Sequence, residues 1–133
     1  TNDGKVWLNR KPGMHSLNTE TGEILWSTIT DKECKEIDTN CDPGISAAVT
    51  AVPGAVIAGH LDGMIRVYDK NNGDILWSFN SLGEYESISG TPASGGSFSG
   101  SGPSVRNGFM AINSGYGIYN HMPGNALLLF SIE

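Results

Sequence analysis

The sequence has 133 residues, 38% of them apolar, and a formal net charge of −6. This is the composition of an ordinary folded domain rather than a disordered chain. The eight Lys and Arg residues form no basic patch along the sequence, which argues against a nucleic-acid surface. No run approaches the roughly 18 apolar residues of a membrane-spanning helix, so we expect no membrane span. The 18 glycines, placed between short apolar runs, are typical of a turn-rich all-β fold.

The first predicted element is part of a repeat. Residues 16–27 closely match residues 67–78, and Gly22 and Gly73 are 51 residues apart, as are Trp26 and Trp77. A period of this size is typical of repeat architectures, with propeller blades among the leading candidates.

The two cysteines, Cys34 and Cys41, have six residues between them in a polar stretch. The spacing is wrong for a zinc pair, and no second pair exists to complete a site. The two cysteines form either a disulfide, which is typical of an oxidising compartment, or two free thiols, and the disulfide is favoured.

The second copy of the repeat predicts a β-hairpin, with a strand over residues 64–68, a turn over 69–73 and a return strand over 74–79. Its Asn-Gly pair accepts the positive φ that a tight turn requires. Alternate residues of the return strand place three large apolar side chains on one face, Ile75, Trp77 and Phe79.

The last third of the chain contains partial copies. Residues 105–112 parallel 51–58, and residues 124–131 parallel 62–69. The Gly- and Ser-rich stretch over residues 90–103 is interpreted as an inter-strand loop, because it lacks the Lys-Ser/Thr of a phosphate loop and the helical pattern that follows one.

A β-sandwich also has short strands, but it does not predict a near-identical repeat with fixed Gly and Trp. The sequence therefore predicts an all-β partial propeller of two to three four-stranded blades, whereas complete propellers have about 4–8. The chain starts at Thr1 without a signal-peptide pattern. We expect residues 1–133 to be the C-terminal portion of one propeller domain, completed by its remaining blades or by another copy of the chain.

Both copies resemble the tryptophan-docking motif of quinoprotein propellers, Ala-x-Asp-x-x-Thr-Gly-x-x-x-Trp, although neither begins with Ala. The resemblance implies that an indole wedges between adjacent blades against backbone that Gly keeps accessible. It therefore gives structural docking roles to four residues, Gly22, Trp26, Gly73 and Trp77.

A longer resemblance is carried by residues 41–54, 59–63, 95–97, 102–103, 113–117 and 123–128. These segments resemble polyvinyl-alcohol dehydrogenases and related quinoproteins. The resemblance implies a periplasmic eight-bladed propeller that holds pyrroloquinoline quinone (PQQ) and Ca²⁺ on its axis. Such an enzyme oxidises an alcohol and passes electrons to a cytochrome c. The alternative is a non-catalytic propeller scaffold that uses the same repeat for protein contacts.

Two loops are the candidates for the cofactor-facing side by the same resemblance. One contains Gly44, Ile45 and Ser46, and the other contains Asn113 and Tyr116, whose ring is expected to line the substrate cavity. The alternative is that both are ordinary Gly turns between strands.

No catalytic residue and no metal ligand is assigned to this chain, because the family carries these groups mainly on earlier blades. Asp62, Asp69 and Asp74 are predicted to make local backbone hydrogen bonds in turns. The three histidines, His15, His60 and His121, share no ligand spacing.

Overall fold

The computed structural model describes residues 12–30, 41–117 and 119–132, and these residues form eleven β-strands and no helix. Accordingly, no apolar helix of membrane-spanning length occurs in the described part. The strands are β1 (Gly13–Leu17), β2 (Ile24–Ile29), β3 (Thr50–Val52), β4 (Ala55–Gly59), β5 (Met64–Asp69), β6 (Ile75–Asn80), β7 (Glu84–Glu86), β8 (Pro92–Ser94), β9 (Ser104–Arg106), β10 (Phe109–Ser114) and β11 (Ala126–Ser131). They pair antiparallel, and the predicted all-β class is confirmed.

The central sheet has four strands in the order β3-β4-β5-β6, so neighbours in the chain are also neighbours in the sheet. Glycines with positive φ make its three tight turns, Gly54, Gly63 and Gly73. Met64 lies opposite Asn80 across the β5–β6 hairpin. This is the hairpin predicted from the repeat, and each of its strands ends one residue later than expected.

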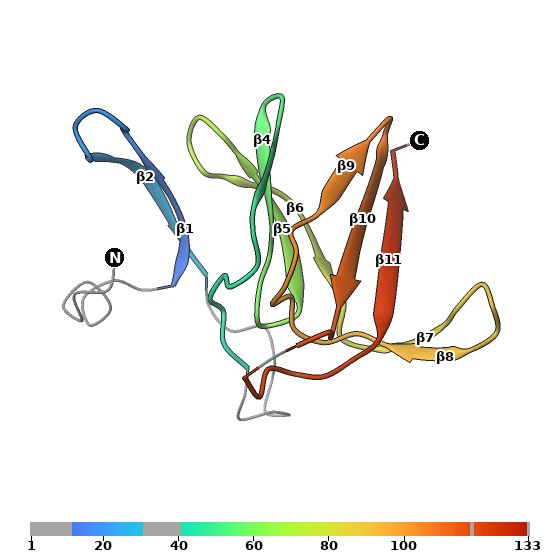
Figure 1. The fold of residues 1–133 in the computed structure, drawn as a ribbon. Helices are drawn as coiled ribbons and strands as arrows, with labels where there is room; N and C mark the ends of the chain where they lie inside the picture. The colour runs from blue at the N-terminus through green and yellow to red at the C-terminus, as the bar shows by residue number, and fades with distance from the viewer. Residues whose placement is uncertain (1–11, 31–40, 118, 133) are drawn as a thin grey trace.

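Three sheets stand side by side, β1–β2, β3–β6 and β9–β11 (Figure 1). The central sheet is covered on both faces, because successive side chains of a strand point to opposite sides. On one face Ile57 and Ile65 pack with Phe98 and Ile112 of later segments. On the other face a second cluster contains Ala58, Tyr68 and Met14 of β1.

The central and third sheets approach each other at their first strands, β3 and β9, which lie in contact. The Thr50 hydroxyl donates to the Pro103 carbonyl at this point. Sheets that stand side by side and meet along their first strands are the arrangement of propeller blades. The described chain is therefore part of a β-propeller, with one complete four-stranded blade between sheets of two and three strands.

Trp26 of β2 connects the first sheet to the central one. Its indole Nε1 donates to the Lys70 carbonyl at 2.9 Å, in the turn between β5 and β6. The Thr28 hydroxyl donates to the Gly73 carbonyl in the same turn. A Cβ atom on Gly73 would overlap the Trp26 ring, so the indole lies directly on the glycine backbone.

Trp77, at the same position of the repeat, has different surroundings. It stacks on Phe79 and meets the edge of Phe130 from the third sheet, with ring centroids 5.5 Å apart in the second pair. A cavity of about 490 Å³ extends from Trp77 to Ile132 between these sheets. Within the described ranges the third sheet has no strand equivalent to β6, so no glycine turn covers this indole and 40% of it is exposed.

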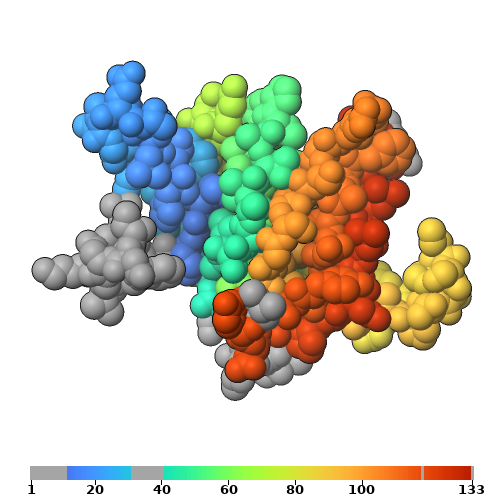
Figure 2. Space-filling view, viewed as in Figure 1, coloured from blue at the N-terminus to red at the C-terminus, as the bar shows by residue number. Residues whose placement is uncertain are grey.

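The segment over residues 90–103 was interpreted as a loop between strands, and this interpretation is wrong for the part that forms a strand. β8 lies inside it and pairs with β7 in a hairpin that projects beyond the third sheet (yellow in Figure 2). Phe98, only 1% exposed, belongs to the core between the central and third sheets. No sequence pattern indicates the core position of Phe98, because it is a lone apolar residue among Ser and Gly. The short strand was missed because this stretch lacks the apolar alternation that marks a strand.

Candidate functional site

Both predicted loops lie at one end of the sheets, the lower end in Figure 1. The segment with Gly44, Ile45 and Ser46 leads into β3, and the connection with Tyr116 joins β10 to β11. The β4–β5 turn, at residues 60–63, lies at the same end.

The β4–β5 turn links the two loops by hydrogen bonds. The Leu61 amide donates to the Gly44 carbonyl at 2.9 Å. The Leu61 carbonyl accepts from the Ser97 hydroxyl, and the Ser97 carbonyl accepts from the Gly115 amide at 3.0 Å. The two loops are thus held in a common frame, although no hydrogen bond between described residues joins them directly.

In the first loop, the three candidate residues differ in what they can do. The Gly44 amide donates to the Asp42 carboxylate at 2.6 Å, and its carbonyl is used by Leu61. Ile45 packs against the apolar cluster on the first-sheet face of the central sheet. Only the Ser46 side chain is exposed and available to a ligand.

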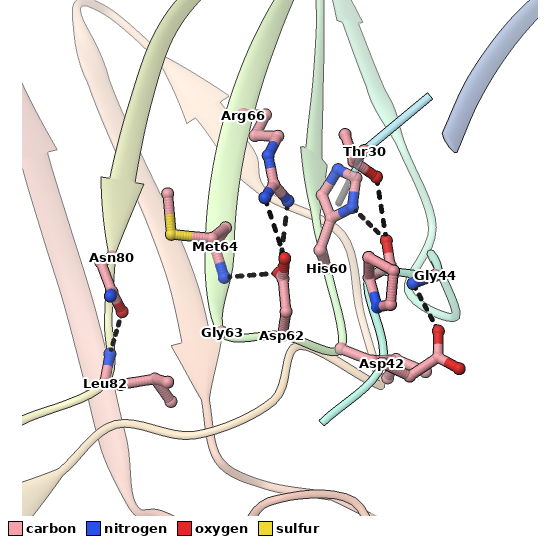
Figure 3. Close-up of polar contacts among 12 residues, drawn as sticks. Thr30, Asp42, Gly44, His60, Asp62, Gly63, Met64, Arg66, Asn80 and Leu82 are labelled. Atoms are coloured by element: carbon pink, nitrogen blue, oxygen red, sulfur yellow. Dashed lines mark hydrogen bonds and ion pairs between the residues drawn. The ribbon is translucent and has the colours of Figure 1, made fainter. Parts of the chain in front are cut away.

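His60 lies beside this loop (Figure 3), and it is completely buried. Its Nδ1 is 2.8 Å from the Pro43 carbonyl, and its Nε2 is 2.9 Å from the Tyr68 hydroxyl. Burial lowers the pKa of His60, against a smaller opposing effect of the Pro43 hydrogen bond. Burial also raises the pKa of Tyr68 to about 12, so both groups are neutral at pH 7. Both imidazole nitrogens already have partners, which leaves none to bind a metal.

Asp62 and Arg66 form a buried ion pair beside His60. Two guanidinium nitrogens of Arg66 reach the Asp62 carboxylate, at 2.8 and 3.2 Å, and both side chains are almost fully buried. Asp62 also accepts from the Met64 amide at 3.1 Å, the local backbone bond predicted for a turn aspartate. The ion pair was not predicted. Because the Asp62 carboxylate is bound by Arg66 and the Met64 amide, it has a structural role in the β4–β5 turn.

In the second loop, Asn113 and Tyr116 are both exposed. Asn113 is the next-to-last residue of β10 and lies opposite Leu127, on the face that points away from the central sheet. Ser114 is completely buried and accepts from the Gly96 amide at 2.9 Å. The Tyr116 hydroxyl donates to the Asn125 carbonyl at 2.9 Å, which fixes a ring that is 57% exposed.

The described residues do not fit a Ca²⁺ site. No three of their His, Cys, Asp or Glu side chains are grouped to hold a metal, and the two carboxylates nearest the loops are bound by Gly44 and Arg66.

Two buried polar atoms beside Gly117 lack a hydrogen-bond partner among the described residues, Ser99 Oγ and His121 Nδ1. Buried polar atoms normally have partners. Both atoms lie close to the connection that carries Tyr116, so the described residues do not satisfy every polar group in this part of the second loop.

The predicted disulfide falls partly outside the described residues. Cys41 is buried, with 4% of its surface exposed, but Cys34 is not described. The disulfide stays a prediction.

Sequence reasoning missed the hydrogen bonds of His60 with Tyr68 and Pro43, and it missed the buried ion pair that Arg66 forms nearby. Tyr68 and Arg66 lie on the same face of β5, which a period of two could have shown. Their association with His60 and Pro43 depends on how the loop crosses the end of the blade, and no sequence pattern carries that information.

No known family profile matches the chain. Two curated proteins are similar to it over 92% of its length, and both are polyvinylalcohol dehydrogenases. The protein from Pseudomonas sp is 34% identical over 133 residues, and the protein from Sphingopyxis sp. (strain 113P3) is 31% identical over 135 residues. The chain spans 21% of the length of each of these relatives.

Proposed function

We propose that the chain belongs to the family of the polyvinylalcohol dehydrogenases, to which it is similar, and that it forms part of a dehydrogenase that oxidises an alcohol. The observation that carries the proposal is the similarity over 92% of the chain, which includes both candidate loops. Polyvinyl alcohol or another compound with secondary hydroxyl groups is the proposed substrate class.

PQQ is the proposed cofactor, with Ca²⁺ held by residues outside the described part of this chain. When bound, the quinone supplies the two-electron acceptor that alcohol oxidation requires. A cytochrome c is the proposed electron acceptor, and the periplasm the proposed location.

The proposed contribution of this chain is to position and enclose rather than to transfer protons. Ser46 offers a hydroxyl at the margin of the cofactor, and the exposed Tyr116 ring forms an apolar wall of the substrate cavity. Gly44, Ile45 and Asn113 support these two positions through their backbone and packing contacts.

Turnover by the protein that contains this chain tests the proposal. After reconstitution with PQQ and Ca²⁺, we expect an alcohol to reduce both an artificial dye and a cytochrome c. The Tyr116→Leu variant should raise KM several-fold, whereas Ile88→Ser, at an exposed hairpin tip, is the matched control and should not. Absence of turnover with PQQ and Ca²⁺ would instead favour the non-catalytic scaffold.

A further inference from the structure

His60 is one of the buried titratable residues that the proposed function does not use. We propose that His60 positions the loop over residues 43–46, so that Ser46 is presented to the cofactor. The role of Ser46 rests on the proposed function, whereas the positioning of the loop does not.

The hydrogen bonds of His60 define its protonation. A backbone carbonyl only accepts, so Nδ1, at 2.8 Å from the Pro43 oxygen, must carry the hydrogen. Nε2 then has the lone pair and accepts from the Tyr68 hydroxyl at 2.9 Å. One neutral tautomer satisfies both contacts, and it holds the imidazole in one orientation.

This tautomer connects the loop to the centre of the blade. Tyr68 is fully buried in the cluster with Met14 and Ala58, so one end of the connection is fixed by packing. The other end is the Pro43 carbonyl, which also accepts from the Thr30 hydroxyl at 3.3 Å. Proline has no amide hydrogen, so this carbonyl is the only backbone group through which Pro43 can be held.

The neighbouring Leu61–Gly44 bond uses only backbone atoms and would exist with other residues at position 60. It anchors Gly44 through its carbonyl but does not hold the peptide before it. That peptide is held by the Gly44–Asp42 bond and the Thr30–Pro43 bond, and His60 adds the shorter of the two bonds to the Pro43 carbonyl. Ser46 follows Pro43 by three residues, so its position depends on both bonds.

Two substitutions separate the halves of this connection. In His60→Asn the side-chain amide nitrogen overlays Nδ1 and can still donate to Pro43, but the contact with Tyr68 is lost. In His60→Gln the amide overlays Nε2 and can still accept from Tyr68, but the donor to Pro43 is lost. Each variant removes one hydrogen bond of the same buried residue, so each is a control for the general cost of the change.

Amide hydrogen exchange, measured in the full chain, tests whether His60 positions the loop. We expect the amides of Gly44, Ile45, Ser46 and Leu61 to exchange roughly two- to tenfold faster in His60→Gln, the effect of losing one net hydrogen bond. In His60→Asn they should stay near the wild-type rates. Equal acceleration in both variants, or none in either, overturns the proposal.

Cofactor affinity separates this inference from the proposed function. In the protein that contains this chain, fluorescence titration with PQQ should give a several-fold weaker Kd for His60→Gln than for His60→Asn. Equal Kd values despite faster exchange would refute the presentation of Ser46 to the cofactor. If the wild-type protein itself does not bind PQQ, the proposed function fails, and the exchange result still decides whether His60 positions the loop.

Discussion

Gly22 and Gly73 occupy the same position of the repeat and have nearly the same backbone conformation, with φ of 73° and 78°. Their surroundings differ. Nothing lies within 4 Å of a Cβ atom built on Gly22, whereas one built on Gly73 would overlap the Trp26 ring. At Gly22 only the backbone conformation of the turn requires glycine, whereas at Gly73 the docked indole requires it as well.

Substitution of each glycine by alanine tests this separation. Gly22→Ala should lower the free energy of unfolding by about 1–2 kcal/mol, the cost of a left-handed conformation for an L-residue. Gly73→Ala should cost about 1–3 kcal/mol more, because Trp26 must also move. Urea denaturation of the two variants measures the difference, and equal losses would show that the indole does not depend on this glycine.

His60 gives stability a specific pH dependence. Burial lowers its folded-state pKa below the usual 6.5, and the nearby Arg66 adds to this while the Pro43 hydrogen bond and Asp62 oppose it. The unfolded chain therefore binds a proton more readily than the folded chain just below pH 6.5. The stabilisation is complete above pH 6.5 and is lost as the pH falls from there toward the folded-state pKa.

Melting temperatures at pH 7 and pH 5 check this expectation. The wild-type chain should lose more stability between these values than the His60→Asn variant, which has no imidazole at this position. Carboxylates contribute equally to both chains, so the difference isolates His60. Identical losses would contradict the assignment.

Among the elements, the segment from β7 to β9 combines two different parts. Its hairpin carries Ile88 at a fully exposed tip, whereas Phe98, ten residues later, fills the core between two blades. A hydrogen bond stabilises the base of the β7–β8 hairpin, where the Tyr85 hydroxyl donates to the Ser81 carbonyl at 2.7 Å. The tip is therefore dispensable for stability, and the segment that follows is not.

Two side-chain substitutions in this segment should differ sharply in their effect on the free energy of unfolding. Phe98→Ala should destabilise the chain by about 3–5 kcal/mol, as for a large aromatic removed from a core. Ile88→Ser should change stability by less than about 0.5 kcal/mol. Thermal or urea unfolding measures both, and a small effect at Phe98 would mean that the central and third sheets do not share a core.

For the whole molecule, the outer surface of the third sheet is apolar and uncovered. Leu127 and Leu129 are 68% and 67% exposed, because they alternate with Leu128 and Phe130, which face the central sheet. β11 is also an edge strand in the described sheet. In a propeller this face would meet a neighbouring blade, and an exposed apolar edge strand favours association.

The isolated chain should therefore self-associate at micromolar concentration. Light scattering after size exclusion measures its mass, and a double variant, Leu127→Lys with Leu129→Lys, should shift it toward one subunit without a comparable loss of stability. A single-subunit mass for the wild-type chain, together with a cooperative melt, would contradict this expectation.

The sequence by itself determined the all-β class, the hairpins of the repeat and the blade period, because alternation, Gly turns and a recurring Trp are local signals. It also indicated which two loops carry the family resemblance. Only the tertiary structure showed that Trp26 lies on Gly73 while Trp77 does not have an equivalent cover. The core role of Phe98 and the network of His60, Tyr68 and Pro43 likewise appeared only there. These contacts join residues 8 to 47 positions apart and depend on how the blades pack, and no local pattern encodes that packing.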